Sequence, residues 1–197
     1  EVISAGWVTT FNEYTVASEN RVTPIPPDVP FDVASLLGCA VTTGLGIVFN
    51  NAGLMPGQSI AVFGVGGVGL NVVQGAALVN AYPIVAIDLH AHKLEQAVAF
   101  GATHTVNAAQ ADPAAVLREL SARRGFDATV DVPGNSKVRQ IAYETTSNTG
   151  KPIFAGVPHH QEAITIDSFP LHFGRQLMGS HGGETRHHVD ITRYIQL

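Results

Sequence analysis

The sequence predicts an α/β protein with a doubly wound parallel sheet, and three observations point to that class. Apolar runs of strand length alternate with helical patterns from about residue 60 onward. The first run, residues 60–63, breaks into a Gly-x-Gly-x-x-Gly turn at residues 64–69. The second run, residues 83–87, ends in Asp88, nineteen residues after Gly69. Strand, glycine turn, helix, strand and acid therefore follow one another in the order that such a sheet requires.

The glycine turn and the acid together predict a dinucleotide site. Gly64 supplies the backbone angles of the turn, Gly66 lets the main chain approach a pyrophosphate, and Gly69 lets the helix pack close to the strand. The helix N-terminus presents free N–H groups to the phosphates. Asp88 is placed to accept hydrogen bonds from the adenosine ribose and favours NAD over NADP, whose 2′-phosphate would meet a like charge. The alternative is that these glycines only turn a strand-to-helix corner.

Each further element follows from a local pattern, because helix caps, glycines and prolines mark the boundaries. Strands are expected at residues 60–63, 83–87, 104–107, 126–132, 152–157 and 176–180. Helices are expected at residues 33–37 after an Asp32 cap, 41–51 before Gly53, 70–80, 91–100 before Gly101, 113–124 after an Asp112 cap, 137–145 and 190–197. Right-handed crossovers through these helices give a sheet order of 3-2-1-4-5-6.

The N-terminal region differs from the rest. Residues 7–11 and 13–16 alternate like short strands, and the prolines of residues 24–30 predict a linker, so this part resembles the tail of a β-rich module. Residues 33–87 hold no charged side chain and no histidine, which raises the alternative of a membrane span. Polar pairs such as Asn50-Asn51 interrupt each candidate, so we expect a buried parallel sheet and no membrane segment.

The amino-acid composition limits the remaining classes of protein. The 197 residues carry a net charge of −5 with 14% charged side chains, which argues against a nucleic-acid surface. Cys39 is the single cysteine, so no internal disulfide can form and a reducing cytoplasm is expected. The pairs His159-His160 and His187-His188 are not expected to chelate one metal, because neighbouring side chains on a strand point to opposite faces.

Five segments carry a resemblance to a known family: residues 37–44 around Cys39, Pro56-Gly57, the glycine turn through Leu70, residues 99–103, and residues 156–158. With them the chain resembles the zinc-type alcohol dehydrogenases of the medium-chain dehydrogenase/reductase superfamily. The resemblance implies an NAD-binding Rossmann domain at residues 31–197, preceded at residues 1–30 by a remnant of a GroES-like catalytic domain and a linker. Because the family's other zinc ligands lie in that catalytic domain, the chain is expected to be part of a longer enzyme.

The resemblance also implies residue roles. Cys39 would be one ligand of a catalytic zinc in the full-length enzyme, which transfers hydride between an alcohol or aldehyde and NAD; no catalytic set is complete in this chain. Thr43 and Val68 would pack on the nicotinamide, with a core valine as the alternative for Val68. Leu89 would cover the adenine, while Lys93 either approaches the ribose or is a solvated surface lysine. The expected cofactor contacts are Thr43, Gly64, Val65, Gly66, Gly67, Val68, Gly69, Asp88, Leu89, Lys93, Val132, Ala155, Gly156, Val157, Ser180 and His181.

Two other functions stay open at this level. A zinc-independent quinone or enoyl reductase of the same superfamily would share the sheet but lack the Gly-Cys segment, so Cys39 discriminates against it. A dinucleotide-binding module without chemistry is the second alternative. The family often pairs subunits through the sixth strand, so residues 175–183 are expected to form the edge of a homodimer.

Overall fold

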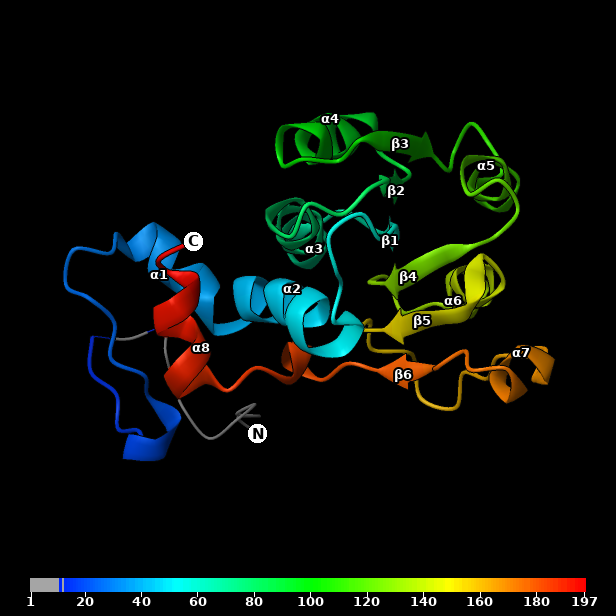
Figure 1. Ribbon diagram of the computed structural model, residues 1–197. Coiled ribbons are helices and arrows are strands. Elements are labelled where there is room, and N and C mark those ends of the chain that lie inside the picture. Colours follow the sequence, from blue (N-terminus) through cyan, green and yellow to red (C-terminus); the bar gives the residue numbers. More distant parts are fainter. Residues whose placement is uncertain (1–10, 12) are drawn as a thin grey trace.

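The computed structural model describes residue 11 and residues 13–197, which contain a six-stranded parallel sheet in the order β3-β2-β1-β4-β5-β6 (Figure 1). All five strand pairs are parallel. The strands are β1 Ile60–Phe63, β2 Ile84–Asp88, β3 His104–Asn107, β4 Phe126–Asp131, β5 Thr146–Phe154 and β6 Met178–Gly179. The predicted fold class and strand order are therefore confirmed.

Helices cover both faces of the sheet (Figure 1). On one face, Ile60 and Val62 of β1 pack in a cluster with side chains of α3 (Gly67–Leu78) and α4 (Ala91–Ala99). On the other face, Ala61 and Phe63 pack in a second cluster with α5 (Pro113–Leu120) and α6 (Ser136–Glu144). Successive residues of a strand point to opposite faces, so a strand covered on both sides is apolar throughout. After β5 the chain also forms α7 Phe169–His172, the short 3-10 turn η4 Gly182–Glu184, and α8 His187–Tyr194.

One continuous helix of 22 residues runs from Phe31 to Ala52. It comprises α1 Phe31–Leu36, a π-helical turn η2 Leu37–Val41, α2 Thr42–Gly46 and a second π-helical turn η3 Ile47–Ala52. The prediction of two helices with Cys39 between them was wrong, because residues 37–41 continue the helix as a π-helical turn. Gly44 serves close packing within this helix, since a Cβ there would overlap Asn71 of α3. Gly53, with φ of +57°, ends the helix.

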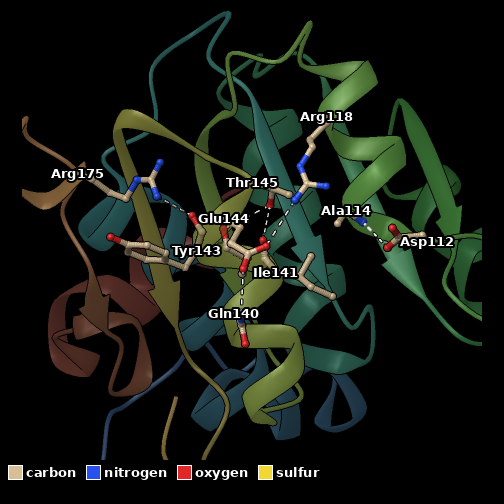
Figure 2. Close-up of polar contacts among 10 residues, drawn as sticks. Asp112, Ala114, Arg118, Gln140, Ile141, Tyr143, Glu144, Thr145 and Arg175 are labelled. Atoms are coloured by element: carbon tan, nitrogen blue, oxygen red, sulfur yellow. Dashed lines mark hydrogen bonds and ion pairs between the residues drawn. The ribbon is translucent and has the colours of Figure 1, made fainter. Parts of the chain in front are cut away.

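The predicted cap of this helix was also wrong. Pro30 holds the N-cap position, and the Asp32 carboxylate accepts a hydrogen bond only from the adjacent Val33 N–H, at 2.9 Å. A proline fixes the backbone angle before the first turn, so the helix begins two residues earlier than the acid would place it. By contrast, Asp112 caps α5 as predicted, accepting from Ala114 N–H at 3.1 Å (Figure 2).

The Phe31–Ala52 helix is long and apolar enough to cross a membrane by length and composition, with a mean hydropathy of 1.7. Our expectation that polar pairs interrupt every candidate was therefore wrong, since Asn50 and Asn51 lie inside the helix. A core helix of a soluble protein passes the same test, and this one packs against α3, η4 and α8. The absence of a membrane segment stays a prediction.

The described part of the N-terminal region is not β-rich. Residues 13–30 contain one 3-10 turn, η1 Glu19–Arg21, and no strand. The alternation of residues 13–16 predicted a strand wrongly, because a strand needs a neighbouring strand to pair with and the described chain offers none there. The alternation of residues 7–11 lies, except for Phe11, outside the described residues. The division of the chain at residue 30 stays a prediction.

Several element ends differ from the prediction. Helix α5 ends at Leu120, four residues early, and β6 is confined to two residues. β5 begins at Thr146, six residues early, because Arg175 fixes the chain there: its guanidinium donates to the carbonyls of Tyr143, Thr146 and Ser147. The guanidinium also lies over the Tyr143 ring, 4.7 Å from its centroid (Figure 2). Arg175 is buried and is therefore not part of an exposed sheet edge.

Candidate functional site

The glycine turn has the geometry that its spacing predicts. Gly64 adopts a φ of +80°, and its N–H donates to the Ile87 carbonyl of β2 at 2.8 Å. A Cβ on Gly69 would overlap the Gly64 carbonyl group, so only glycine lets α3 approach β1 this closely. A Cβ on Gly66 would meet nothing within 4 Å. Gly66 therefore borders open space at the N-terminus of α3, whose first N–H groups have no partner inside the helix.

Asp88 lies directly against this turn. Its Oδ2 accepts a hydrogen bond from the Val65 N–H and its Oδ1 accepts one from the His90 N–H, both at 3.0 Å. The carboxylate is half-buried and therefore also reachable from outside. The acid at the end of β2 and the glycine corner after β1 are thus joined in one structure, although nineteen residues separate Asp88 from Gly69 in sequence.

A cavity of about 410 Å³ opens beside Asp88, above the carboxyl ends of β1 and β2. Apolar side chains from two strands, two helices and three loops form most of its wall. Leu89 and Lys93, the residues predicted to contact the adenosine half of a dinucleotide, are among those that line it. Its other lining residues are Phe63, Gly64, Ile87, His90, Ala108, Pro113, Pro133, Asn135, Lys137, Val138 and Ile141.

The loops after β4 and β5 pack tightly together on the other side of β1. Gly134, with φ of +79°, and Gly156 lie so close that a Cβ on Gly156 would fall 2.5 Å from the Gly134 Cα. The Ala155 and Gly156 N–H groups both donate to the Asp131 carbonyl. The predicted contacts Val132, Ala155, Gly156 and Val157 therefore belong to one rigid pair of loops, in which the Ala155 N–H is already engaged and the Val157 side chain is exposed.

Asp131 and Arg139 hold these loops and were missed by sequence reasoning. Arg139 Nε lies 3.0 Å from Asp131 Oδ2, and the Asp131 side chain is fully buried. Burial raises the pKa of Asp131, against the Gly134 N–H and the Arg139 guanidinium, which both lower it. The signal in the sequence is an acid that closes a buried strand and a base one turn into the next helix, but that spacing alone is common.

The segment after β6 meets the Phe31–Ala52 helix. The Ser180 hydroxyl donates to Asn51 Oδ1 at 2.7 Å, and Gly183 packs against the Thr43 carbonyl. Thr43 and Ser180 thus come from elements that lie in contact, while the His181 side chain is exposed. Val68 lies in the first turn of α3, and its carbonyl is close to Gly44 of the Phe31–Ala52 helix. The segments that carry the predicted nicotinamide contacts Thr43, Val68 and Ser180 therefore lie in contact with one another.

Cys39 is exposed and lies inside the Phe31–Ala52 helix. The next residue, Ala40, approaches Gly67 at the start of α3, within 3.7 Å of where a Gly67 Cβ would be. Among the residues that the structure describes, no three His, Cys, Asp or Glu side chains come together as a metal site. A zinc ion with three protein ligands does not fit this part of the chain alone, so Cys39 can be at most one member of a larger ligand set.

An acid fixed against a glycine corner, open space before a helix N-terminus and an apolar cavity beside them define the cofactor-binding domain of a Rossmann-type protein. Comparison with known proteins gives the particular family. The family described as zinc-binding dehydrogenase matches residues 67–197, and the chain belongs to it.

The most similar relatives include alcohol dehydrogenases. The chain is 38% identical over 194 residues to alcohol dehydrogenase class-3 of Cereibacter sphaeroides, covering 94% of this chain and 52% of the relative. It is 40% identical over 176 residues to S-(hydroxymethyl)glutathione dehydrogenase of Saccharomyces cerevisiae, covering 87% of this chain and 46% of the relative. The chain therefore spans about half the length of the curated relatives it matches.

Solved structures agree with this family assignment. An alcohol dehydrogenase zinc-binding domain protein from Burkholderia ambifaria superimposes with a TM-score of 0.88 at 28% identity, covering 93% of this chain and 50% of that one. Benzyl alcohol dehydrogenase from Acinetobacter calcoaceticus also gives a TM-score of 0.88, at 27% identity, covering 93% of this chain and 51% of that one.

Proposed function

We propose that this chain is the NAD-binding part of a zinc-dependent alcohol dehydrogenase. One observation carries the cofactor assignment: the Asp88 carboxylate is held at the glycine corner by two main-chain N–H groups and borders the apolar cavity. An adenosine in that cavity would place its ribose hydroxyls beside Asp88 and its phosphates over Gly66 and the N-terminus of α3.

The same carboxylate supports NAD as the preferred cofactor. Each oxygen of Asp88 accepts one main-chain hydrogen bond and keeps a further lone pair for a ribose hydroxyl. The 2′-phosphate of NADP would replace a hydrogen-bond donor by a negative charge at the same place. Lys93 and Lys137 also line the cavity, but each carries its charge on a flexible side chain, whereas the Asp88 carboxylate is fixed by two main-chain hydrogen bonds.

We further propose the reaction of the full-length protein. NAD supplies a hydride acceptor and NADH a hydride donor when bound, and the relatives are named as dehydrogenases of alcohols, so an alcohol or aldehyde is the proposed substrate class. The share of this chain is to bind and orient the cofactor. Cys39 is proposed as one zinc ligand, whose partners would come from the part of the protein outside this chain. A cytoplasmic location is proposed on the single cysteine alone.

Titration of the chain with NADH and with NADPH, followed by nicotinamide fluorescence, tests the cofactor proposal. We expect NADH to bind at least about tenfold more tightly, because NADPH loses charge-assisted hydrogen bonds to Asp88 and gains a like-charge contact. An Asp88→Ser variant should bring the two affinities closer together. Equal affinities in the unchanged chain would remove Asp88 from the proposal, and binding of neither would contradict the proposal as a whole.

A further inference from the structure

Asp131, Arg139 and Gly156 form a closed ring of hydrogen bonds at the carboxyl edge of the sheet. Arg139 Nε donates to Asp131 Oδ2 at 3.0 Å, and Arg139 Nη2 donates to the Gly156 carbonyl at 2.6 Å. The main-chain carbonyl of Asp131 closes the ring by accepting from the Gly156 N–H at 3.0 Å. A single guanidinium therefore joins the end of β4 to the loop that follows β5.

This ring fixes the direction of the peptide group between Gly156 and Val157. The Gly156 carbonyl cannot rotate without losing Arg139, and its N–H is held by Asp131. The Gly134 N–H donates to Asp131 Oδ1 at 2.9 Å, so the β4–α6 loop is tied to the same carboxylate. Arg139 also lies over the Phe154 ring, 5.1 Å from its centroid, which restricts the guanidinium plane. The main chain at Val157 therefore leaves the ring in one orientation.

Stability alone does not explain this arrangement. The Asp131 side chain is fully buried and Arg139 is 12% exposed, so both charges lose most of their hydration. A buried ion pair often contributes no more to stability than apolar side chains of the same volume. A guanidinium that donates in two directions is, however, a rigid connector, because its donors have fixed relative directions. The pair is therefore better suited to setting geometry than to adding stability.

The position of the ring in the fold indicates which part of a bound dinucleotide it would orient. In a doubly wound sheet the ligand crosses the point where strand order reverses, which here lies between β1 and β4. The cavity beside Asp88 takes the adenosine half on the β2 side of that point. The other half of an extended dinucleotide then lies over the loops that end β4 and β5, where the ring is.

We propose that Arg139 and Asp131 are positioning residues that orient the Gly156–Val157 main chain to receive the nicotinamide carboxamide. This inference rests on the proposed function, since it requires NAD to bind in the extended pose. Neither side chain needs to touch the cofactor. Each acts through the main-chain groups of the loop after β5, which carry the hydrogen bonds.

Arg139→Lys is the most informative variant. A lysine keeps the positive charge beside Asp131, but a single ammonium on a flexible stem does not hold Asp131 and the Gly156 carbonyl in the same fixed directions. The double variant Asp131→Asn with Arg139→Met removes both charges and keeps an oxygen for the Gly134 N–H. Arg118→Ala is the control, because it breaks the half-exposed pair with Glu144 at the far end of α6, 3.5 Å apart (Figure 2).

The affinities for two ligands distinguish a positioning role of Arg139 and Asp131 from a general structural role. NADH contains the nicotinamide, whereas ADP-ribose has the adenosine, the pyrophosphate and the second ribose but no nicotinamide, so both are titrated into each variant by calorimetry. For Arg139→Lys and the double variant we expect NADH to bind about three- to tenfold more weakly, the effect of one or two neutral hydrogen bonds, with ADP-ribose affinity unchanged. The bound nicotinamide should also lose its characteristic fluorescence shift. Arg118→Ala should change neither affinity.

Other results would overturn the inference. Unchanged NADH affinity in a folded Arg139→Lys protein would show that the bridge does not position the loop, and equal weakening of NADH and ADP-ribose would show a general structural role. If the unchanged chain bound ADP-ribose but gained nothing from the nicotinamide, the inference would fail while the adenosine site stood. If it bound neither ligand, the proposed function would fail and the inference with it.

Discussion

At the scale of single residues, two glycines of the same turn have opposite environments. A Cβ on Gly69 would meet the Gly64 carbonyl group, which is backbone and cannot move aside, whereas a Cβ on Gly66 would meet only open space. Gly66 has a φ of −79°, which any residue can adopt. Gly69 is thus required by the fold, whereas Gly66 is required only by what comes to lie against it.

Alanine substitutions should separate these two requirements. Gly69→Ala should destabilise the chain by about 3 kcal/mol or more, because a methyl group is forced into a packed contact between β1 and α3. Gly66→Ala should leave the free energy of unfolding within about 1 kcal/mol and weaken NADH binding about tenfold or more, because the methyl group occupies the approach of the pyrophosphate.

Urea unfolding and NADH titration of both variants check this prediction. Gly66→Ala is the matched control for Gly69→Ala in the unfolding experiment, since the added group is the same. A stable Gly69→Ala protein would contradict the packing argument. A Gly66→Ala protein that binds NADH as tightly as the original would show that the phosphates do not lie over this turn.

At the scale of elements, the Phe31–Ala52 helix shows where a sequence pattern misleads. The sequence predicted a break between residues 37 and 41, but the helix continues through it, and Gly44 and Gly46 lie where the helix packs against α3 and against Gly183. A glycine costs helix propensity of about 1 kcal/mol, and close tertiary contact offsets that cost. Gly38 has nothing within 4 Å of a placed Cβ, so it alone lacks such a contact.

Gly38→Ala and Gly44→Ala should therefore act in opposite directions. Gly38→Ala should stabilise the chain by about 0.5–1 kcal/mol, because the exposed helix gains propensity at no steric cost. Gly44→Ala should destabilise it by about 2–3 kcal/mol, because its methyl group would overlap Asn71 and approach the Val68 carbonyl within 2.8 Å. Thermal unfolding measures both, and a shift of the same sign in the two variants would contradict the packing described here.

A structural feature could be predicted from the sequence where its cause lies in neighbouring residues. The order of strands and the meeting of Asp88 with the glycine turn follow from local patterns and from the handedness of crossovers, and both are confirmed. The extent of β5 depends on Arg175, which comes 29 residues after Thr146 and was not predicted. The Asp131–Arg139 bridge depends on the depth of burial at the end of β4, which no spacing reports.

At the scale of the whole molecule, the free edge of the sheet carries the proposal of a homodimer. β6 pairs with β5 on one side, and no strand of the described chain pairs with its other side. Exposed apolar rings of Phe169 and Phe173 lie in the segment that leads into it. Because Arg175 is buried, we narrow the proposed contact from residues 175–183 to the residues that follow it.

Sedimentation equilibrium at micromolar concentration tests the dimer. A chain of 20.7 kDa should sediment with about twice that mass. A Gly179→Pro variant should restore the monomer: the neighbouring N–H of Ser180 donates to Phe154 of β5, so the N–H of residue 179 faces the free edge, and a proline there removes it. Monomer alone for the unchanged chain would contradict the proposed pairing and leave the cofactor site unaffected, because Asp88 and the glycine turn lie on the other side of β1 from β6.

The central claim is that the corner after β1 and the acid at the end of β2 hold the adenosine half of NAD. A crystal structure of the chain with NADH tests it most directly. We expect both ribose hydroxyls within hydrogen-bond distance of the Asp88 carboxylate and the pyrophosphate beside Gly66. Adenosine bound away from Asp88, or a closed cavity with NADH on another face of the sheet, would contradict it.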